Sequence, residues 1–137
     1  IYADLVYIDP PYNSRQYCDA YHLLENVALW QKPALKGTAK KMPRAALKSR
    51  YCTLGAAEAF ADLIKNINAK YIMFSYNNMA KKGNGRSNAR ISDNDIMRIL
   101  SEKGKVSVFS QKYKPFSAGK SKISGHRERL FLCEVKK

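Results

Sequence analysis

The sequence predicts an open α/β sheet, because short apolar runs rich in β-branched and aromatic residues alternate with amphipathic stretches of helical period. The expected order along the chain is strand, helix, helix, strand, helix, strand, strand. Helices between the first three strands imply right-handed parallel crossovers, and the last two strands can pair as an antiparallel hairpin. Ligand sites in such sheets lie at the carboxyl ends of the strands. Functional residues are therefore expected directly after a strand.

The beginning of the chain predicts a strand, a turn and a helix in immediate succession. Residues 1–9 (IYADLVYID) form a short apolar run that is typical of a buried parallel strand. Pro10 and Pro11 follow at once, and two prolines cannot continue a hydrogen-bonded ladder, so the chain must leave the sheet there. Residues 16–30 then carry apolar side chains at helical spacing, and Pro33 closes this helix.

The middle of the chain predicts a basic loop, a helix and a second strand. Residues 36–48 are the basic loop. Residues 56–67 are rich in alanine, and their larger apolar side chains, among them Phe60 and Ile64, fall on one helical face. Residues 69–75 (AKYIMFS) have the composition of a second buried strand.

The last third of the chain predicts one more helix and two closing strands. Ser92 and Asp95 form a capping box that starts the helix, and Gly104 ends it. Residues 106–113 and 129–135 are apolar runs of strand length. The segment between these two strands is polar and basic, so it is expected to be a loop.

The chain is strongly basic, with 25 Lys and Arg against 11 Asp and Glu in 137 residues, a formal net charge of +14. The excess is concentrated in residues 36–50, 81–90 and 114–127, most of which read as loops. Cationic loops around an apolar scaffold suit contact with a phosphate backbone, where affinity comes from counterion release. A solvated basic surface without a specific partner is the alternative. The candidate DNA contacts in the second segment are Lys81, Lys82, Arg86 and Arg90.

Membrane, disulfide-rich and metal-dependent proteins are disfavoured by the sequence. No apolar run approaches the roughly 18–20 residues that span a bilayer, and the first residues have no signal-peptide pattern, so we expect a soluble intracellular protein. Cys18, Cys52 and Cys133 are odd in number and lack C-x-x-C spacing, which favours buried free thiols. No His, Asp and Glu cluster has ligand spacing, so no metal is expected and a metal hydrolase fits poorly.

The strongest functional signal is Asp9-Pro10-Pro11-Tyr12, directly after the first predicted strand. A planar aromatic amine is a poor nucleophile, because its lone pair is delocalised into the ring. The Asp9 carboxylate and the Pro10 carbonyl can each accept a hydrogen bond from it, which exposes the lone pair. Tyr12 can stack on the ring, a contact worth about 1–3 kcal/mol, and a duplex base must flip out to reach it. The alternative is a plain turn, which Asp and Pro both favour.

Four segments resemble Dam-like adenine-specific DNA methyltransferases, particularly those of restriction–modification systems. They are YIDPPYNSRQY, YHLLENVALWQKP, MFSYNN and the closing RERLFLCEV. The resemblance implies a Rossmann-like methyltransferase sheet and methyl transfer from S-adenosyl-L-methionine to the 6-amino group of adenine in double-stranded DNA. It also implies a bacterial cytoplasmic enzyme, and it allows for a cognate restriction endonuclease as a partner.

The resemblance assigns roles to individual residues. By this resemblance, Asp9 and Pro10 activate the amine, Tyr12 stacks on the adenine, and Asp9 also lies near the methionine end of the cofactor. Pro11 shapes the turn. For the neighbouring residues, a polar loop that leads into a helix and an ordinary Asn-Asn turn are the structural alternatives. The residues expected to border the base or the DNA are Asn13, Ser14, Arg15, Tyr17, Tyr76, Asn77 and Asn78.

Three ring side chains outside the motif receive other interpretations. Trp30 is expected in the packed face of the first helix and not as a platform for a base. His126 lies in the third basic segment, where contact with phosphate is expected. His22 is followed by apolar residues at helical spacing, which favours a packed or capping histidine.

One element of the family is missing from the sequence. The Gly-rich cofactor-binding element, Phe-x-Gly-x-Gly after an earlier strand, does not occur, and Gly83-Asn84-Gly85 lies in a basic loop that cannot replace it. We therefore expect residues 1–137 to be the C-terminal part of a single methyltransferase catalytic domain, with the N-terminal cofactor-binding half absent. The chain would then be an expressed fragment, a proteolytic product or one piece of a split gene. Alone, it should bind cofactor weakly and methylate little. Its first strand should leave an open edge for self-association or for the complementing half.

Two alternative functions remain open from the sequence. Related (Asp/Asn/Ser)-Pro-Pro-aromatic motifs serve methyltransferases that act on RNA adenine, DNA cytosine or protein amides. The leading Asp and the Ser-Tyr-Asn-Asn segment favour adenine in DNA. The second alternative is a truncated, non-catalytic nucleic-acid-binding remnant, which the composition supports equally well.

Overall fold

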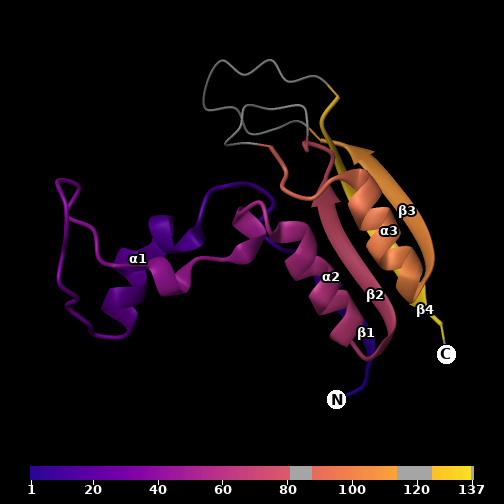
Figure 1. The fold of residues 1–137 in the computed structure, drawn as a ribbon, viewed down its shortest axis with the longest axis horizontal. Coiled ribbons are helices and arrows are strands. Elements are labelled where there is room, and N and C mark those ends of the chain that lie inside the picture. Colours follow the sequence, from indigo (N-terminus) through magenta and orange to yellow (C-terminus); the bar gives the residue numbers. More distant parts are fainter. Residues whose placement is uncertain (81–87, 114–124, 137) are drawn as a thin grey trace.

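A computed structural model of the chain describes residues 1–80, 88–113 and 125–136. Within these residues the fold is a four-stranded mixed sheet with two helices packed on it and a third helix on a separate arm (Figure 1). In chain order the elements are β1 (Ala3–Ile8), α1 (Tyr17–Ala28), the 3₁₀ turns Ala45–Leu47 and Arg50–Cys52, α2 (Ala56–Asn66), β2 (Ala69–Asn77), α3 (Asp93–Lys103), β3 (Gly104–Lys112) and β4 (Arg127–Val135).

The strands lie in the order β1-β2-β4-β3. β1 pairs with β2 in parallel, and β4 pairs antiparallel with both β2 and β3, so β1, β2 and β3 all run in the same direction. The open α/β sheet predicted from the sequence, with a closing antiparallel pair, is therefore confirmed. What the sequence did not indicate is that β4 inserts between β2 and β3.

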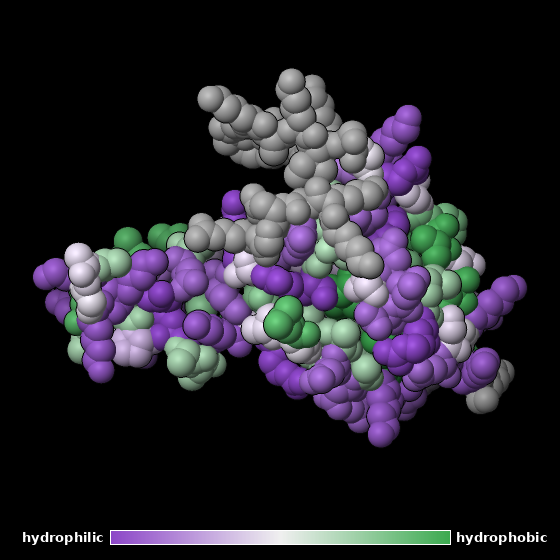
Figure 2. All heavy atoms as spheres, turned by 45° about the horizontal axis from the view of Figure 1, so that its top comes forward, coloured by the Kyte–Doolittle hydropathy of each residue, from purple (hydrophilic) through white to green (hydrophobic). Residues whose placement is uncertain are grey.

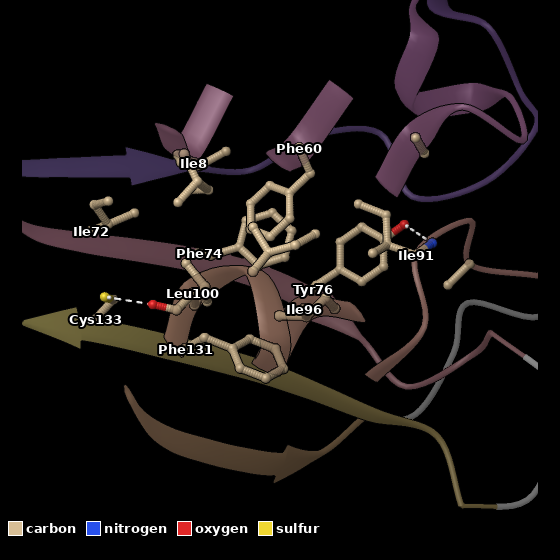
Figure 3. Packing of buried hydrophobic residues seen from close by; sticks show 14 of the residues in the cluster. Ile8, Phe60, Ile72, Phe74, Tyr76, Ile91, Ile96, Leu100, Phe131 and Cys133 are labelled. Atoms are coloured by element: carbon tan, nitrogen blue, oxygen red, sulfur yellow. Dashed lines mark hydrogen bonds between the residues drawn. The ribbon is translucent and has the colours of Figure 1, made fainter. Parts of the chain in front are cut away.

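One face of the sheet carries the hydrophobic core. Side chains of alternate residues in β2 point to this face, and Ile72, Phe74 and Tyr76 are each at most 1% exposed. The Phe74 ring stacks on Phe60 from α2, with centroids 4.2 Å apart, and on Tyr76 on its other side, with centroids 5.2 Å apart (Figure 3). Phe131 of β4 packs against Phe74 in a tilted arrangement. Beyond Tyr76, at the carboxyl end of β2, the core continues through Met79, Ala89 and Ile91.

The third helix begins and ends as its sequence predicts. The Ser92 hydroxyl oxygen accepts a hydrogen bond from the Asp95 backbone N–H at 3.1 Å, and the hydroxyl donates to the Asp95 carboxylate at 2.6 Å. At the other end, Gly104 passes directly into β3. A Cβ on Gly104 would lie 1.9 Å from the carbonyl oxygen of Glu134 in β4, so the close pairing of these strands requires glycine here.

The opposite face of the sheet is not covered by any helix of the described residues. Leu5 and Tyr7 of β1 are 50% and 57% exposed, and Phe109 of β3 is also exposed. The sequence predicted a buried first strand, which is wrong for most of β1, because only Ile8 is buried. β1 lies at the edge of the sheet and only its α2-facing side chains have a packing partner, so alternate residues remain exposed.

An arm formed by α1 and the residues up to 48 projects away from the sheet (Figure 1). It is closed at its base by the half-exposed Ser49 and the buried Gln16, whose side-chain amide donates to the Ser49 carbonyl at 3.1 Å and accepts from the Ser49 N–H at 2.8 Å. Arg44 and Asp19 form an ion pair of 2.6 Å within the arm.

The helix on this arm has no buried residue. The prediction that Trp30 packs in a helix core is wrong: α1 ends at Ala28, and Trp30 follows with φ +52° and 85% exposure. Apolar side chains are interspersed with hydrophilic ones over the surface of the arm (Figure 2). The exposed large apolar residues of the helix and the residues after it are Tyr17, Tyr21, Leu23, Leu24, Val27, Leu29 and Trp30.

Two of the three cysteines are buried free thiols, as the sequence predicts. Cys18, Cys52 and Cys133 are free thiols, of which Cys52 and Cys133 are buried and Cys18 is half-buried. Burial raises the pKa of the Cys52 and Cys133 thiols, so both are poor nucleophiles. Among the described residues, no helix combines the length and the apolar character needed to cross a membrane.

Candidate active site at the carboxyl ends of β1 and β2

The two strand ends singled out by the sequence lie side by side. Ile8 of β1 pairs with Phe74 of β2, so the residues that follow each strand meet at one edge of the sheet. At this edge Pro10 is buried, whereas Asp9 is exposed and Tyr12 is 38% exposed. The buried proline anchors the turn in the protein, and the carboxylate and the aromatic ring on either side of it face solvent.

Hydrogen bonds from two other segments hold Tyr12 in place. Its carbonyl oxygen accepts a hydrogen bond from the Arg90 backbone N–H at 2.9 Å and one from the Tyr76 hydroxyl at 3.3 Å. The rings of Tyr12 and Tyr76 meet edge to face, with centroids 6.3 Å apart and an interplanar angle of 86°. Burial raises the pKa of the Tyr12 phenol, and the nearby Glu128 adds to the effect, so its ring stays neutral at physiological pH.

The residues directly after the motif form a turn that leads into α1. The Asn13 side-chain oxygen accepts a hydrogen bond from the Arg15 backbone N–H at 2.9 Å, which is the geometry of an Asx turn. The Arg15 carbonyl accepts a weak bond from the Cys52 thiol at 3.3 Å. The side chains of Arg15 and Tyr17 are exposed. The local role of Asn13 is thus a structural one, while Arg15 and Tyr17 are accessible to a ligand.

Asn77 and Asn78 brace the end of β2. Asn77 is 1% exposed, and its side-chain oxygen accepts from the Met79 N–H at 3.0 Å. The Asn78 amide donates to the Gly125 carbonyl at 3.0 Å and accepts from the Arg127 N–H at 2.9 Å. We call the side chains of Tyr76, Asn77 and Asn78 the wall at the end of β2: Tyr76 contacts Tyr12, whereas the hydrogen bonds of Asn77 and Asn78 reach Met79, Gly125 and Arg127.

Arg129 of β4 reinforces this wall. Its guanidinium donates to the Asn77 carbonyl at 2.6 Å, forms an ion pair with Asp93 at the start of α3, and lies 5.1 Å from the ring centroid of Phe131. The Arg129 side chain is only 9% exposed. It therefore ties the end of β2 to the first turn of α3.

A histidine–glutamate pair at the same edge was not predicted as part of the site. Glu128 lies opposite Asn77 in the sheet register, and its carboxylate is 3.2 Å from His126 Nε2. The sequence placed His126 on phosphate, but its side chain is only 9% exposed and packs edge-on against Tyr113. Burial raises the pKa of Glu128, repulsion from Asp9 adds to this, and His126 opposes it. Only the cross-strand register, which the sequence does not reveal, brings Glu128 to this edge.

The candidate DNA contacts are distributed over separate segments. Lys81, Lys82 and Arg86 lie outside the described residues. Arg90 is half-buried, and its backbone is part of the support for Tyr12. At the tip of the arm, residues 36–41 form a hairpin closed by two backbone hydrogen bonds of 2.8 and 3.1 Å, and its lysines are exposed.

At this edge of the sheet, the exposed groups are the Asp9 carboxylate, the Tyr12 ring and the Arg15 guanidinium. Among the described residues, no three His, Cys, Asp or Glu side chains come together in a way that could hold a metal ion. The arrangement can accept hydrogen bonds from an amine and stack a planar ring beside it.

Comparison with known proteins defines the class. Residues 1–84 match the family described as D12 class N6 adenine-specific DNA methyltransferase, and the chain belongs to this family. The four-stranded mixed sheet agrees with part of a Rossmann-like methyltransferase fold. No solved structure matches the chain.

Three similar proteins are named as a modification methylase or as type II methyltransferases. The chain is 45% identical over 130 residues to Modification methylase StsI of Streptococcus sanguinis, which covers 93% of the chain and 18% of that protein. It is 35% identical over 123 residues to Type II methyltransferase M.FokI of Planomicrobium okeanokoites, and this match covers 89% of the chain and 18% of that protein. It is 33% identical over 128 residues to Type II methyltransferase M.NlaIII of Neisseria lactamica, and this match covers 93% of the chain and 35% of that protein. The chain thus spans about a fifth of the length of the first two relatives.

Proposed function

We propose that the protein is a site-specific DNA methyltransferase that transfers a methyl group from S-adenosyl-L-methionine to the 6-amino group of a flipped-out adenine, and that this chain handles the base. The observation that carries the proposal is the Asp9-Pro10-Pro11-Tyr12 turn at the edge where β1 and β2 end, in a chain of the D12 family. The description of the family, which names adenine-specific DNA methyltransferases, supports DNA as the substrate, and the names of the relatives, a modification methylase and a type II methyltransferase, agree with methyl transfer.

The proposed chemistry assigns a task to each residue of the motif. The exposed Asp9 carboxylate and the Pro10 carbonyl accept hydrogen bonds from the two amine protons, so that the lone pair becomes available for attack. The Tyr12 ring stacks on the adenine and holds it against these acceptors. Pro10 and Pro11 keep the acceptors in a rigid geometry before the base arrives, which avoids reorganisation during the reaction.

S-adenosyl-L-methionine supplies an electrophilic methyl group when it is bound. In the described residues, the exposed Asp9 is the side chain suited to its methionine end, and no glycine-rich strand end is present beside it. We propose that residues 1–137 are the C-terminal part of one catalytic domain and that the rest of the cofactor site comes from another segment or chain. The isolated chain is then expected to bind the cofactor weakly and to methylate little.

We further propose partners for the basic surface and for the free edge. The exposed lysines of residues 36–41 and the basic segment of residues 81–90 contact DNA phosphates. The edge of β1 that faces away from β2 accepts a strand from the complementing half or from a second copy. The protein acts in the bacterial cytoplasm, beside a cognate restriction endonuclease where one is encoded.

A methyl-transfer assay on the full-length protein tests the proposed function. DNA and RNA of the same sequence are offered in parallel with a labelled methyl donor, and the modified base is identified after digestion to nucleosides. Label in N6-methyladenine from DNA is the expected result. Label in cytosine or in RNA would favour the alternative methyltransferases, and no transfer to any substrate would favour a non-catalytic binding protein.

The basic segment offers a separate test of DNA binding. Neutralising four of its residues together is expected to weaken DNA binding and to flatten its dependence on salt, by about 0.9 in the logarithmic slope for each phosphate that the protein no longer neutralises. An unchanged slope would remove this segment from the proposed interface. The four residues are Lys81, Lys82, Arg86 and Arg90.

A further inference from the structure

The Tyr76 hydroxyl joins three segments of the chain at the carboxyl end of β2. It donates a hydrogen bond to the Tyr12 carbonyl at 3.3 Å, and its oxygen accepts from the backbone N–H groups of Arg90 and Ile91, each at 3.1 Å. Figure 3 shows the ring of Tyr76 in the core and one of the hydrogen bonds that reach the segment of Ile91. A phenol has one proton and two acceptor sites, so all its hydrogen-bonding capacity is used.

The segments that meet on this hydroxyl are the ones that build the candidate site. Tyr12 belongs to the motif after β1, and Arg90 and Ile91 precede the N-cap of α3. The Arg90 N–H also reaches the Tyr12 carbonyl directly, at 2.9 Å. The Tyr12 carbonyl therefore receives two donors, both of which depend on where the hydroxyl of Tyr76 lies.

The ring that carries the hydroxyl is fixed by the core. Tyr76 is 1% exposed and its ring stacks nearly parallel on Phe74, at 5.2 Å and 17°. On the side of the site, it meets the Tyr12 ring edge to face at 6.3 Å. Since a ring packed in this way cannot shift without opening the core, it is a rigid reference point for the more exposed Tyr12.

We propose that Tyr76 is a positioning residue for methyl transfer: its hydroxyl sets the position of the Tyr12 backbone, and thereby of the ring that stacks on the adenine. This inference rests on the proposed function. Tyr76 is not expected to touch the base, because it is buried behind Tyr12. Its effect on the reaction is exerted through Tyr12.

The protonation state of Tyr76 agrees with this role. Burial raises the pKa of the phenol, and the N–H groups of Ile91 and Arg90 oppose the rise only in part. The hydroxyl therefore keeps the proton that it donates to Tyr12 at physiological pH. Without the hydroxyl, the N–H of Ile91, a residue with no exposed surface, would lose its acceptor, so the segment would have to move.

Substituting Tyr76→Phe in the full-length protein tests the proposal, because it removes one oxygen and keeps the packed ring. The readout is the single-turnover rate constant of adenine methylation with enzyme in excess, which does not depend on the fraction of active molecules. We expect the rate constant to fall by about 10- to 100-fold, which corresponds to a displacement of the Tyr12 ring by about 1 Å. The affinity for DNA is expected to change by less than about twofold. Tyr51→Phe is the matched control, since in the described residues the buried Tyr51 hydroxyl has no hydrogen-bond partner.

A double-mutant cycle separates positioning from general damage to the fold. If Tyr76 acts through Tyr12, Tyr76→Phe lowers the rate constant much less in a Tyr12→Ala background than in the wild type. Equal losses in both backgrounds would overturn the proposal, as would a Tyr76→Phe rate constant equal to that of wild type. A wild-type protein that does not methylate adenine refutes the proposed function instead, so the two failures are distinguishable.

Discussion

Arg129 offers a quantitative test of how the wall at the end of β2 is held together. Its guanidinium donates a charge-assisted hydrogen bond to the Asn77 carbonyl at 2.6 Å, a contact worth about 1.5–3 kcal/mol. The ion pair with the half-exposed Asp93 adds about 0.2–1 kcal/mol. Replacing Arg129 by Met keeps an apolar stem over Phe131 and removes both of these interactions together with the cation–π contact on Phe131. We therefore expect the free energy of unfolding to fall by about 2–4 kcal/mol.

Urea unfolding of the full-length protein, followed by circular dichroism, measures this decrease. Arg127→Met is the matched control, because Arg127 is exposed on the same strand and its guanidinium donates to the Ser110 hydroxyl at 3.2 Å. Its substitution is expected to change stability by less than about 0.5 kcal/mol. If Arg129→Met destabilised the protein no more than Arg127→Met, the brace between β2 and α3 would not exist as described.

Two further predictions concern stability. Gly104→Ala should lower the free energy of unfolding, measured in urea, by about 3 kcal/mol, because the new Cβ would lie 1.9 Å from the Glu134 carbonyl oxygen. Gly55→Ala is the control and should be tolerated, since its Cβ would have its nearest neighbour 3.6 Å away. Similar losses for the two variants would contradict the close packing at Gly104. The raised pKa of Glu128 means that the folded state binds its proton more tightly than the unfolded state, so its contribution favours folding below the usual value of 4.5 and is lost as the pH rises through the folded pKa. Glu128→Gln should remove this dependence from a series of unfolding curves, and an unchanged series would refute it.

The regular elements of the fold could be predicted because their signals are local. The capping box at Ser92, the apolar face of α2 and the proline pair after β1 each depend on residues close in sequence. The position of β4 between β2 and β3 could not be predicted, since it depends on pairing between distant segments. The same limit applies to Glu128, which reaches the site only through its register opposite Asn77.

Burial was the least predictable property. Apolar periodicity shows which side chains can share a face, but it does not show whether another element covers that face. The pattern of residues 16–30 therefore indicated a helix correctly and misplaced Trp30 in a core, and the apolar run of β1 suggested burial that only Ile8 has. The motif at Asp9 was recognisable because its chemistry is contained in four consecutive residues, whereas the hydroxyl of Tyr76 is recognised only by its three partners in space.

The rate of adenine methylation by an Asp9→Ala variant of the full-length protein tests the central claim most directly. Asp9 follows β1 at the site edge, and Asp4 is an exposed aspartate at the other end of the same strand, so Asp4→Ala controls for the loss of a carboxylate. We expect Asp9→Ala to lower the single-turnover rate constant by about 10²–10³-fold, as the loss of one preorganised polar group does in other sites, and Asp4→Ala to leave it unchanged. Methylation by Asp9→Ala at the wild-type rate would contradict the assignment of the amine-activating carboxylate.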